Sequence, residues 1–189
     1  MATGMRTHAI KLFFVMGLAA VLWPLGATTL LQLTLNDMIK QSTGIVRATV
    51  TGTRMDYRGT DIYTYYQLQV SEDWRSPGLT PAVPQIEVAI PGGAAQGARQ
   101  TVAGAPSLQV GQEYVVFLWT SRSGLTQVIG LSQGLFLVKL DTAGNPVLIR
   151  PAASETMLNQ NGQVVQNQPL SLGLAAVRSQ TRQTLGVGQ

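Results

Sequence analysis

The chain has 189 residues, 45% hydrophobic and 12% charged, which is enough for one compact domain and too few for two. It has no cysteine, which excludes disulfides, thiolate metal sites, a cysteine nucleophile and a lipidated cysteine. The net charge is +4, and without Arg6 and Lys11 the excess of basic residues falls to 2, too small for an electrostatic nucleic-acid surface.

Residues 1–27 have the layout of a secretory signal peptide. Two basic residues precede an apolar run over residues 12–23, and a proline and small residues follow it. We expect cleavage after Ala27, which predicts a secreted or periplasmic protein. The alternative is an uncleaved membrane anchor, because residues 12–31 carry no charge and are long enough to span a bilayer.

The first element of the mature chain is a predicted helix over residues 33–41. Thr34 is a suitable N-cap, and Asp37 stands at the third helical position, where it completes a capping box. Leu33 and Met38 are spaced as a hydrophobic staple across this end.

Two strands that alternate in polarity follow and predict a long hairpin, residues 45–53 and 62–70. The side chains expected to face inward are Val46, Ala48, Val50, Ile62, Thr64, Tyr66, Leu68 and Val70. A short third strand over residues 86–90 ends at Pro91, and residues 92–106 are expected to form a surface excursion rich in glycine and alanine.

The stretch Gly111 to Trp119 is apolar on both faces of an extended chain and predicts the central strand. Tyr114, Val116 and Leu118 would face one way, and Val115, Phe117 and Trp119 the other. Further strands are expected over residues 125–131, 134–141 and 147–150, with Phe136, Val138 and Leu140 inward. Residues 153–169, rich in Asn and Gln, predict an exposed loop or weak hairpin, and residues 170–189 a helix from Ser171 and a tail.

This order of elements is that of the OB-fold, a five-stranded and partly open Greek-key barrel. We therefore expect an all-β protein, with an OB-like barrel of five to six strands over residues 28–152 and short N- and C-terminal helices. The segments IVRATVTG, DIYTYYQLQVSEDWRSPG, IEVAIPGG and GAPSLQVGQEYVVFLW also resemble the netrin-like module of tissue inhibitors of metalloproteinases. The matching positions of its L-x-x-G-x-E-Y pattern are Leu108, Gly111, Glu113 and Tyr114.

Residues 33–138 are likewise similar to an uncharacterised family of exported bacterial proteins. The inhibitors begin with a cysteine that chelates the catalytic zinc of the protease, whereas this mature chain would begin near Thr28 and has no cysteine. The resemblance therefore implies the fold, and it does not imply zinc-chelating inhibition.

The candidate binding residues lie on the expected outer face of the first hairpin. Arg47 and Thr49 would sit beside Tyr63 and Tyr65, a surface with which OB barrels bind extended ligands such as glycans, peptides or bases. The alternative is that the aromatic side chains form cross-strand packing pairs. Arg99, in the glycine-rich excursion, is a further candidate for binding an anion.

No catalytic constellation is apparent. The only histidine, His8, belongs to the leader, so the mature chain lacks the commonest general base and nucleophile. Glu72 and Asp73 are adjacent on a strand and would point to opposite faces, which does not suit paired acids. We expect no enzyme, metal or cofactor, but an exported binding module that engages another exported protein, such as a protease. The alternative is a structural envelope protein held by an uncleaved anchor.

Overall fold

The computed structural model describes residues 29–153 and 155–187, so the predicted signal peptide and its cleavage site lie outside the described residues. Strands hold 47% of the chain and helices 14%, which confirms an all-β protein with two short helices. The strands are β1 (Thr29–Leu31), β2 (Gly44–Arg58), β3 (Asp61–Asp73), β4 (Gln85–Pro91), β5 (Gly93–Ala95), β6 (Ala98–Gln100), β7 (Glu113–Thr120), β8 (Thr126–Val128), β9 (Leu135–Leu140), β10 (Pro146–Arg150), β11 (Thr156–Leu158), β12 (Val164–Val165) and β13 (Leu170–Gly173). The helices are α1 (Leu35–Gln41) and α2 (Leu174–Leu185), with a single 3-10 turn at Pro77–Leu79.

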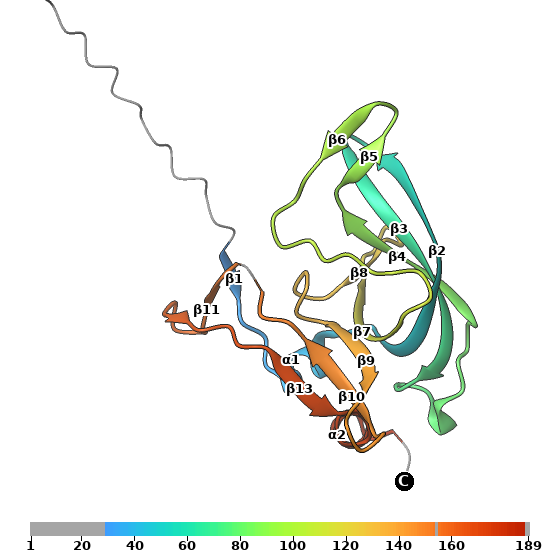
Figure 1. Ribbon diagram of the computed structural model, residues 1–189, viewed down its shortest axis with the longest axis vertical. Coiled ribbons are helices and arrows are strands. Elements are labelled where there is room, and N and C mark those ends of the chain that lie inside the picture. Colours follow the sequence, from blue (N-terminus) through green and yellow to red (C-terminus); the bar gives the residue numbers. More distant parts are fainter. Residues whose placement is uncertain (1–28, 154, 188–189) are drawn as a thin grey trace, which may run out of the picture.

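The main sheet follows the order β13-β10-β9-β7-β2-β3-β4, and every neighbouring pair in it is antiparallel. The predicted hairpin is its longest part, formed by β2 and β3 (Figure 1). All the hairpin side chains expected to face inward are buried, which confirms the inward face, but Tyr65, expected to face outward, is buried too. The predicted excursion carries a small hairpin of its own, β5 and β6.

Strands β8 and β9 lie end to end along the same edge of β7. Val128 is opposite Leu118, and Leu135 is opposite Val116. Between these two pairs, the main-chain N–H of Phe117 donates to the Gly134 carbonyl oxygen, and the Phe117 carbonyl oxygen accepts from the N–H of Ile129. Residues 130–133 therefore form a loop that leaves the sheet between β8 and β9. A Cβ atom at position 134 would come within 2.9 Å of the Phe117 carbonyl oxygen, and only glycine permits this approach.

The sheet does not close into a barrel among the described residues. Strand β8 runs parallel to β4 and lies next to it, with Cα atoms of the two strands within 8 Å. However, β4 pairs only with β3, and β8 pairs only with β7. We call the gap between β4 and β8 the seam. In place of the expected OB-like barrel of five to six strands, the structure thus shows a curved sheet with one open seam.

Two hydrophobic cores lie on opposite faces of the sheet. One contains Tyr114, Val116 and Leu118 of β7 and is enclosed by the sheet. The other contains Val115 and Phe117 and is covered by the two helices. The prediction that β7 is central and buried on both faces is confirmed for these five residues, which are at most 6% exposed.

Two side chains that were expected to face inward are exposed instead. Trp119 is 46% exposed because β7 leaves the helix layer at its end, and Leu140 is 70% exposed because β9 runs out into the turn at residues 141–145. Neither position is covered by a second layer of the fold.

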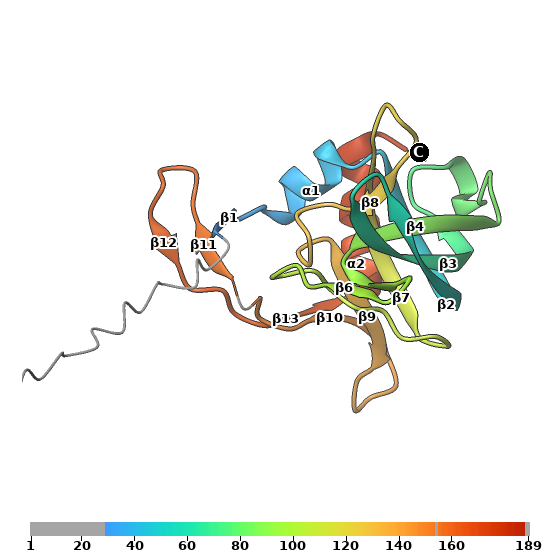
Figure 2. The same cartoon turned by 90° about the horizontal axis from the view of Figure 1, so that it is seen from above.

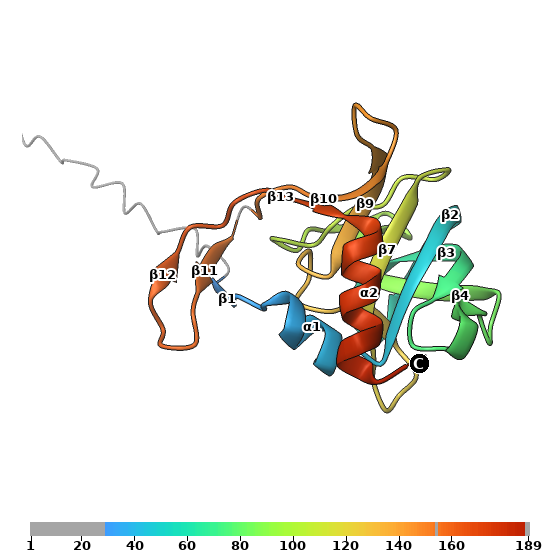
Figure 3. The same cartoon turned by 90° about the horizontal axis from the view of Figure 1, so that it is seen from below.

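Helix α1 begins as predicted. The Thr34 hydroxyl oxygen accepts from the Asp37 N–H at 3.1 Å, and the Asp37 carboxylate accepts from the Thr34 N–H at 3.1 Å, which completes the capping box. Helix α2 begins at Leu174 rather than Ser171, because residues 170–173 pair with β10 as a strand. The two helices lie side by side over one face of the sheet (Figure 3).

Removing the cap of α1 provides a test of this local structure. Thr34→Ala leaves the N–H of Asp37 without its side-chain acceptor, and we expect a loss of about 1 kcal/mol in the free energy of unfolding. Thr34→Ser keeps a hydroxyl group and is the matched control, expected to lose much less. Urea denaturation of the three proteins measures both differences, and equal midpoints for the alanine and serine variants would argue against the cap.

A three-stranded arm projects from the body of the molecule (Figure 2). It consists of the β11–β12 hairpin and of β1, which pairs with β11 in parallel. The Asn- and Gln-rich segment thus forms the hairpin that was predicted as one alternative. Gln133 joins the arm to the body, since its amide donates to the Leu31 carbonyl at 3.0 Å and accepts from the Leu33 N–H at 2.8 Å.

Candidate functional site

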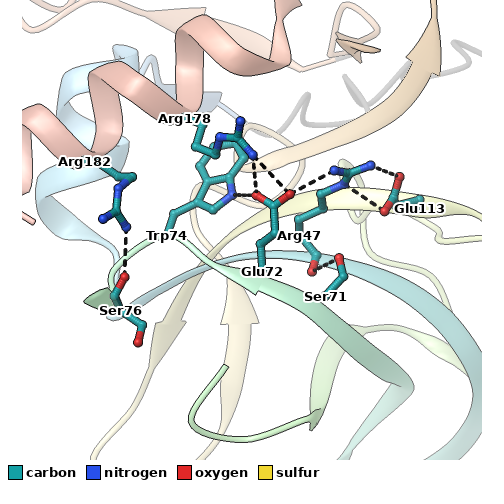
Figure 4. A network of polar contacts seen from close by, with 8 residues as sticks. All are labelled: Arg47, Ser71, Glu72, Trp74, Ser76, Glu113, Arg178 and Arg182. Carbon is teal, nitrogen blue, oxygen red and sulfur yellow. Dashed lines mark hydrogen bonds and ion pairs between the residues drawn. The ribbon is translucent and has the colours of Figure 1, made fainter. Parts of the chain in front are cut away.

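Arg47 lies at the centre of a network of ion pairs and does not face an open surface (Figure 4). Its guanidinium donates from Nε and Nη2 to both carboxylate oxygens of Glu113, at 2.8 and 2.9 Å. A third bond joins Nη1 to Glu72 at 2.9 Å. Arg47 is also opposite Glu72 in the strand register, and not beside the tyrosines as expected. Because its donors are engaged within the chain, Arg47 is a poor candidate for binding a ligand.

Glu72 extends the same network to helix α2. Its carboxylate accepts from the Trp74 indole Nε1 at 2.9 Å and from Arg178 of α2 at 3.1 Å. Burial alone would raise the pKa of Glu72, but hydrogen bonds from Trp74, Arg47 and Arg178 outweigh it and hold the pKa below its ordinary value. The network therefore attaches α2 to the sheet by ion pairs, in addition to the apolar contacts that the same helix makes.

Of the two candidate tyrosines of β3, Tyr65 is covered by Arg54 and not by Arg47. The Arg54 guanidinium lies 4.0 Å above the ring of Tyr65 and is bound by Glu87 at 2.9 and 3.1 Å. Tyr65 is only 7% exposed, and the ring of Tyr63 lies 6.1 Å from it. This arrangement agrees with the packing alternative, since the ring face that a ligand would need is already occupied by Arg54.

The two remaining candidates lie apart from each other. Thr49 is half-buried on β2, opposite Gln69 and Glu113. Arg99 is exposed on β6, at the far end of the first hairpin, and no described carboxylate lies within ion-pair distance of it. The structure thus does not bring the five predicted residues together into one site.

A cavity with a volume of about 680 Å³ lies at the seam. Strand β4 supplies one wall, and β8 with the loop after it supplies the other. We call this space the seam cavity. Its lining residues are Gln41, Ala89, Ile90, Pro91, Pro106, Trp119, Gln127, Val128, Ile129, Gly130 and Leu131.

Two features make the seam cavity suitable for binding. Its lining contains no charged side chain, and the half-exposed indole of Trp119 stands in it, so it can accept an apolar group. The cavity also has a main-chain edge. The Gly92 N–H donates to the Ile62 carbonyl oxygen, so these two residues form a hydrogen-bonded pair of the antiparallel ladder. Such pairs alternate with pairs that are not hydrogen-bonded, and Ala89, opposite Tyr65, belongs to one of the latter. The N–H and carbonyl of Ala89 therefore point away from β3, towards the seam.

The sequence did not reveal this cavity. Trp119 ends a run that is apolar on both faces, so the pattern predicts a buried side chain. The sequence also predicted a strand over residues 125–131, whereas β8 covers only Thr126–Val128 and is too short to cover the seven residues of β4. The seam arises because segments far apart in the chain pair with one another. Such long-range pairing cannot be predicted from the local periodicity of the sequence.

The seam cavity offers recognition and no reactive group. No cluster of three metal-ligating side chains occurs among residues 29–153 and 155–187. None of the helices in the part of the chain that the structure describes is long and apolar enough to cross a membrane. A scan against protein-family models, a search of curated proteins and a search of solved structures each found no match for this chain.

Proposed function

We propose that the protein is an exported, non-catalytic binding module that engages another exported protein at the seam. The observation that carries this proposal is the pairing of an uncharged cavity of about 680 Å³ with an unpaired strand edge. A chemical reaction would require nucleophiles, acids or metal ligands, and the seam cavity is lined by none of them. Binding is the function that its chemistry supports.

The chemistry of the seam selects an extended peptide segment as the ligand. The directed N–H and carbonyl of Ala89 can bond to the main chain of an added strand, which is the mode called β-augmentation. The adjacent cavity can hold one apolar side chain of that strand against Trp119. Strands β4 and β8 are closer than two strand spacings. The added segment therefore lies along the end of β4 near Pro91 and does not pass through the whole seam.

We infer further that the fold is of the OB type. The order β4-β3-β2-β7, followed on the same edge by β8 and β9, supports this, as does the parallel direction of β4 and β8 at the seam. The resemblance to the netrin-like module supports a protease as one class of partner. Inhibition by zinc chelation is not proposed, because the chain has no cysteine.

The experiment places a photo-cross-linking amino acid at position 119 of the exported protein, and in a matched control at Leu140. Both side chains are exposed, but Leu140 lies at the end of β9, away from the seam cavity. We expect position 119 to cross-link to one exported protein and position 140 not to do so. Equal cross-linking from the two positions would contradict the assignment of the binding site to the seam.

Trp119→Ala tests the contribution of the indole to affinity. Peptides selected from a random library on residues 28–189 provide the ligand, and their affinity is measured by calorimetry. We expect Trp119→Ala to weaken binding by about 30-fold, the effect of a central aromatic contact, and Leu140→Ala to leave it unchanged. Undiminished affinity in Trp119→Ala would contradict the proposed site.

The predicted export is tested by the intact mass of the exported product. A chain that begins near Thr28 supports a cleaved signal peptide, whereas a full-length, membrane-bound product supports the alternative of a structural envelope protein held by its N-terminal segment.

A further inference from the structure

Arg150, at the end of β10, is a buried cation with one hydrogen bond. It is 6% exposed, its Nη1 donates to the Gln133 carbonyl oxygen at 2.7 Å, and its guanidinium lies 5.3 Å from the ring centre of Phe136. An arginine side chain has five N–H donors. Most of the donors of Arg150 are therefore not used by the described residues.

Two other arginines of the sheet form ion pairs with carboxylates, Arg47 with Glu113 and Arg54 with Glu87. No carboxylate of the described residues lies within 4.0 Å of Arg150. Burial lowers the pKa of Arg150, with no opposing interaction. A buried charge without a counter-ion costs free energy, which the binding of an anion would recover.

Arg150 lines a cavity of about 350 Å³ between the start of α1 and the segment that leads into β13. We call it the α1 cavity. Its other lining residues are uncharged, being apolar or carrying an amide or a hydroxyl group: Gln32, Leu33, Thr34, Leu35, Met38, Phe136, Gln166, Asn167, Gln168, Leu170 and Leu172. Arg150 is the only charged residue in this lining, so the wall of the cavity carries one positive charge.

We propose that the α1 cavity binds the carboxyl end of a peptide or an N-acyl amino acid, with the carboxylate on Arg150. A guanidinium matches a carboxylate by two parallel N–H···O bonds. The apolar residues would hold the ligand side chain, and the amides of Gln32, Gln166 and Gln168 can pair with its peptide group. This site is distinct from the seam and does not depend on the proposed function there.

The charge of the cavity distinguishes the ligand from a phosphate. One cation balances a carboxylate, whereas a phosphate near pH 7 carries more than one negative charge and would remain partly uncompensated. Arg150 also lines a second cavity of about 400 Å³. Glu155 lines this second cavity, and its carboxylate disfavours an anion there. The α1 cavity is therefore the side on which an anion is expected.

The test compares two ligands that differ in one charge. N-acetyl-leucine has a carboxylate, and N-acetyl-leucinamide is its neutral analogue. Binding to residues 28–189 is followed by the NMR signals of the Met38 methyl group and the Leu33 amide, which line the cavity. We expect N-acetyl-leucine to bind at least about tenfold more tightly than the amide, and inorganic phosphate not to shift these signals.

Two variants link the binding to Arg150. Arg150→Lys keeps the charge and loses the two-pronged geometry, so we expect affinity for N-acetyl-leucine to fall about tenfold. Arg122→Lys, at an exposed position, is the matched control and should bind like the wild type. If the wild type binds both ligands equally, or neither, the proposal is overturned, and Arg150 acts only as a structural contact to Gln133. The comparison of the two ligands is made on the wild-type protein, so its result does not depend on whether any variant folds.

Discussion

The Trp74→Ala variant is expected to lose about 3–5 kcal/mol of unfolding free energy, the usual effect of deleting a large aromatic side chain from a packed core. Trp74 is fully buried in the core beneath the two helices, and its main-chain N–H donates to the Ile45 carbonyl at 2.8 Å. The indole also donates to Glu72. The substitution therefore leaves a cavity and removes one bond of the network that holds α2.

Urea denaturation measures this effect, and the second described tryptophan serves as the control. Trp119 is half-exposed at the seam, so Trp119→Ala removes few packed contacts and should cost far less stability. A similar loss of stability in the two variants would contradict the assignment of Trp74 to the core and of Trp119 to the surface.

The Glu72→Gln variant is expected to lose about 1–3 kcal/mol, the range for a hydrogen bond to a charged group. Arg47 keeps its bidentate pair with Glu113, whereas Arg178 loses the only carboxylate with which it forms an ion pair among the described residues. The amide can still accept from the Trp74 indole. Glu87→Gln, which affects an exposed pair with Arg54, is the control and should change stability much less.

The same variant should alter the dependence of stability on pH. Since the pKa of Glu72 is below its ordinary value of 4.5 in the folded protein, its charge stabilises the fold above about pH 4.5. This contribution is lost as the pH falls from there through the lower pKa of the folded state. We therefore expect the stability difference between wild type and Glu72→Gln to shrink on acidification. A difference that stays constant down to pH 3 would contradict this role.

Local patterns predicted the parts of the fold that depend on neighbouring residues. The capping box of Thr34 and Asp37 needs only a spacing of three residues. The inward face of β3 needs only alternation, and the burial of β7 on both faces needs only an unbroken apolar run. Each of these features was found where the sequence placed it.

The parts that depend on long-range register were not predicted. Arg47 was assigned to a ligand surface because its partner Glu113 is 66 positions away and its partner Glu72 is 25 positions away. Tyr65 was expected beside Arg47, but β2 contains register shifts between residues 47 and 48 and between 50 and 52, and Arg54 is opposite Tyr65. Leu170 to Gly173 resembles the first turn of a helix, but its pairing with β10 makes it a strand.

The attachment of β1 to β11 constrains the order in which the chain can fold during synthesis. Strand β1 pairs with β11, helix α1 lies against α2, and the Gln133 bond to Leu31 also spans 102 positions. Closing such long loops costs entropy before any contact forms. Strand β1 therefore gains its strand partner only when most of the chain has been made. A first strand that is paired late stays free of sheet structure for longer, which would suit passage of the N-terminal segment through a narrow channel.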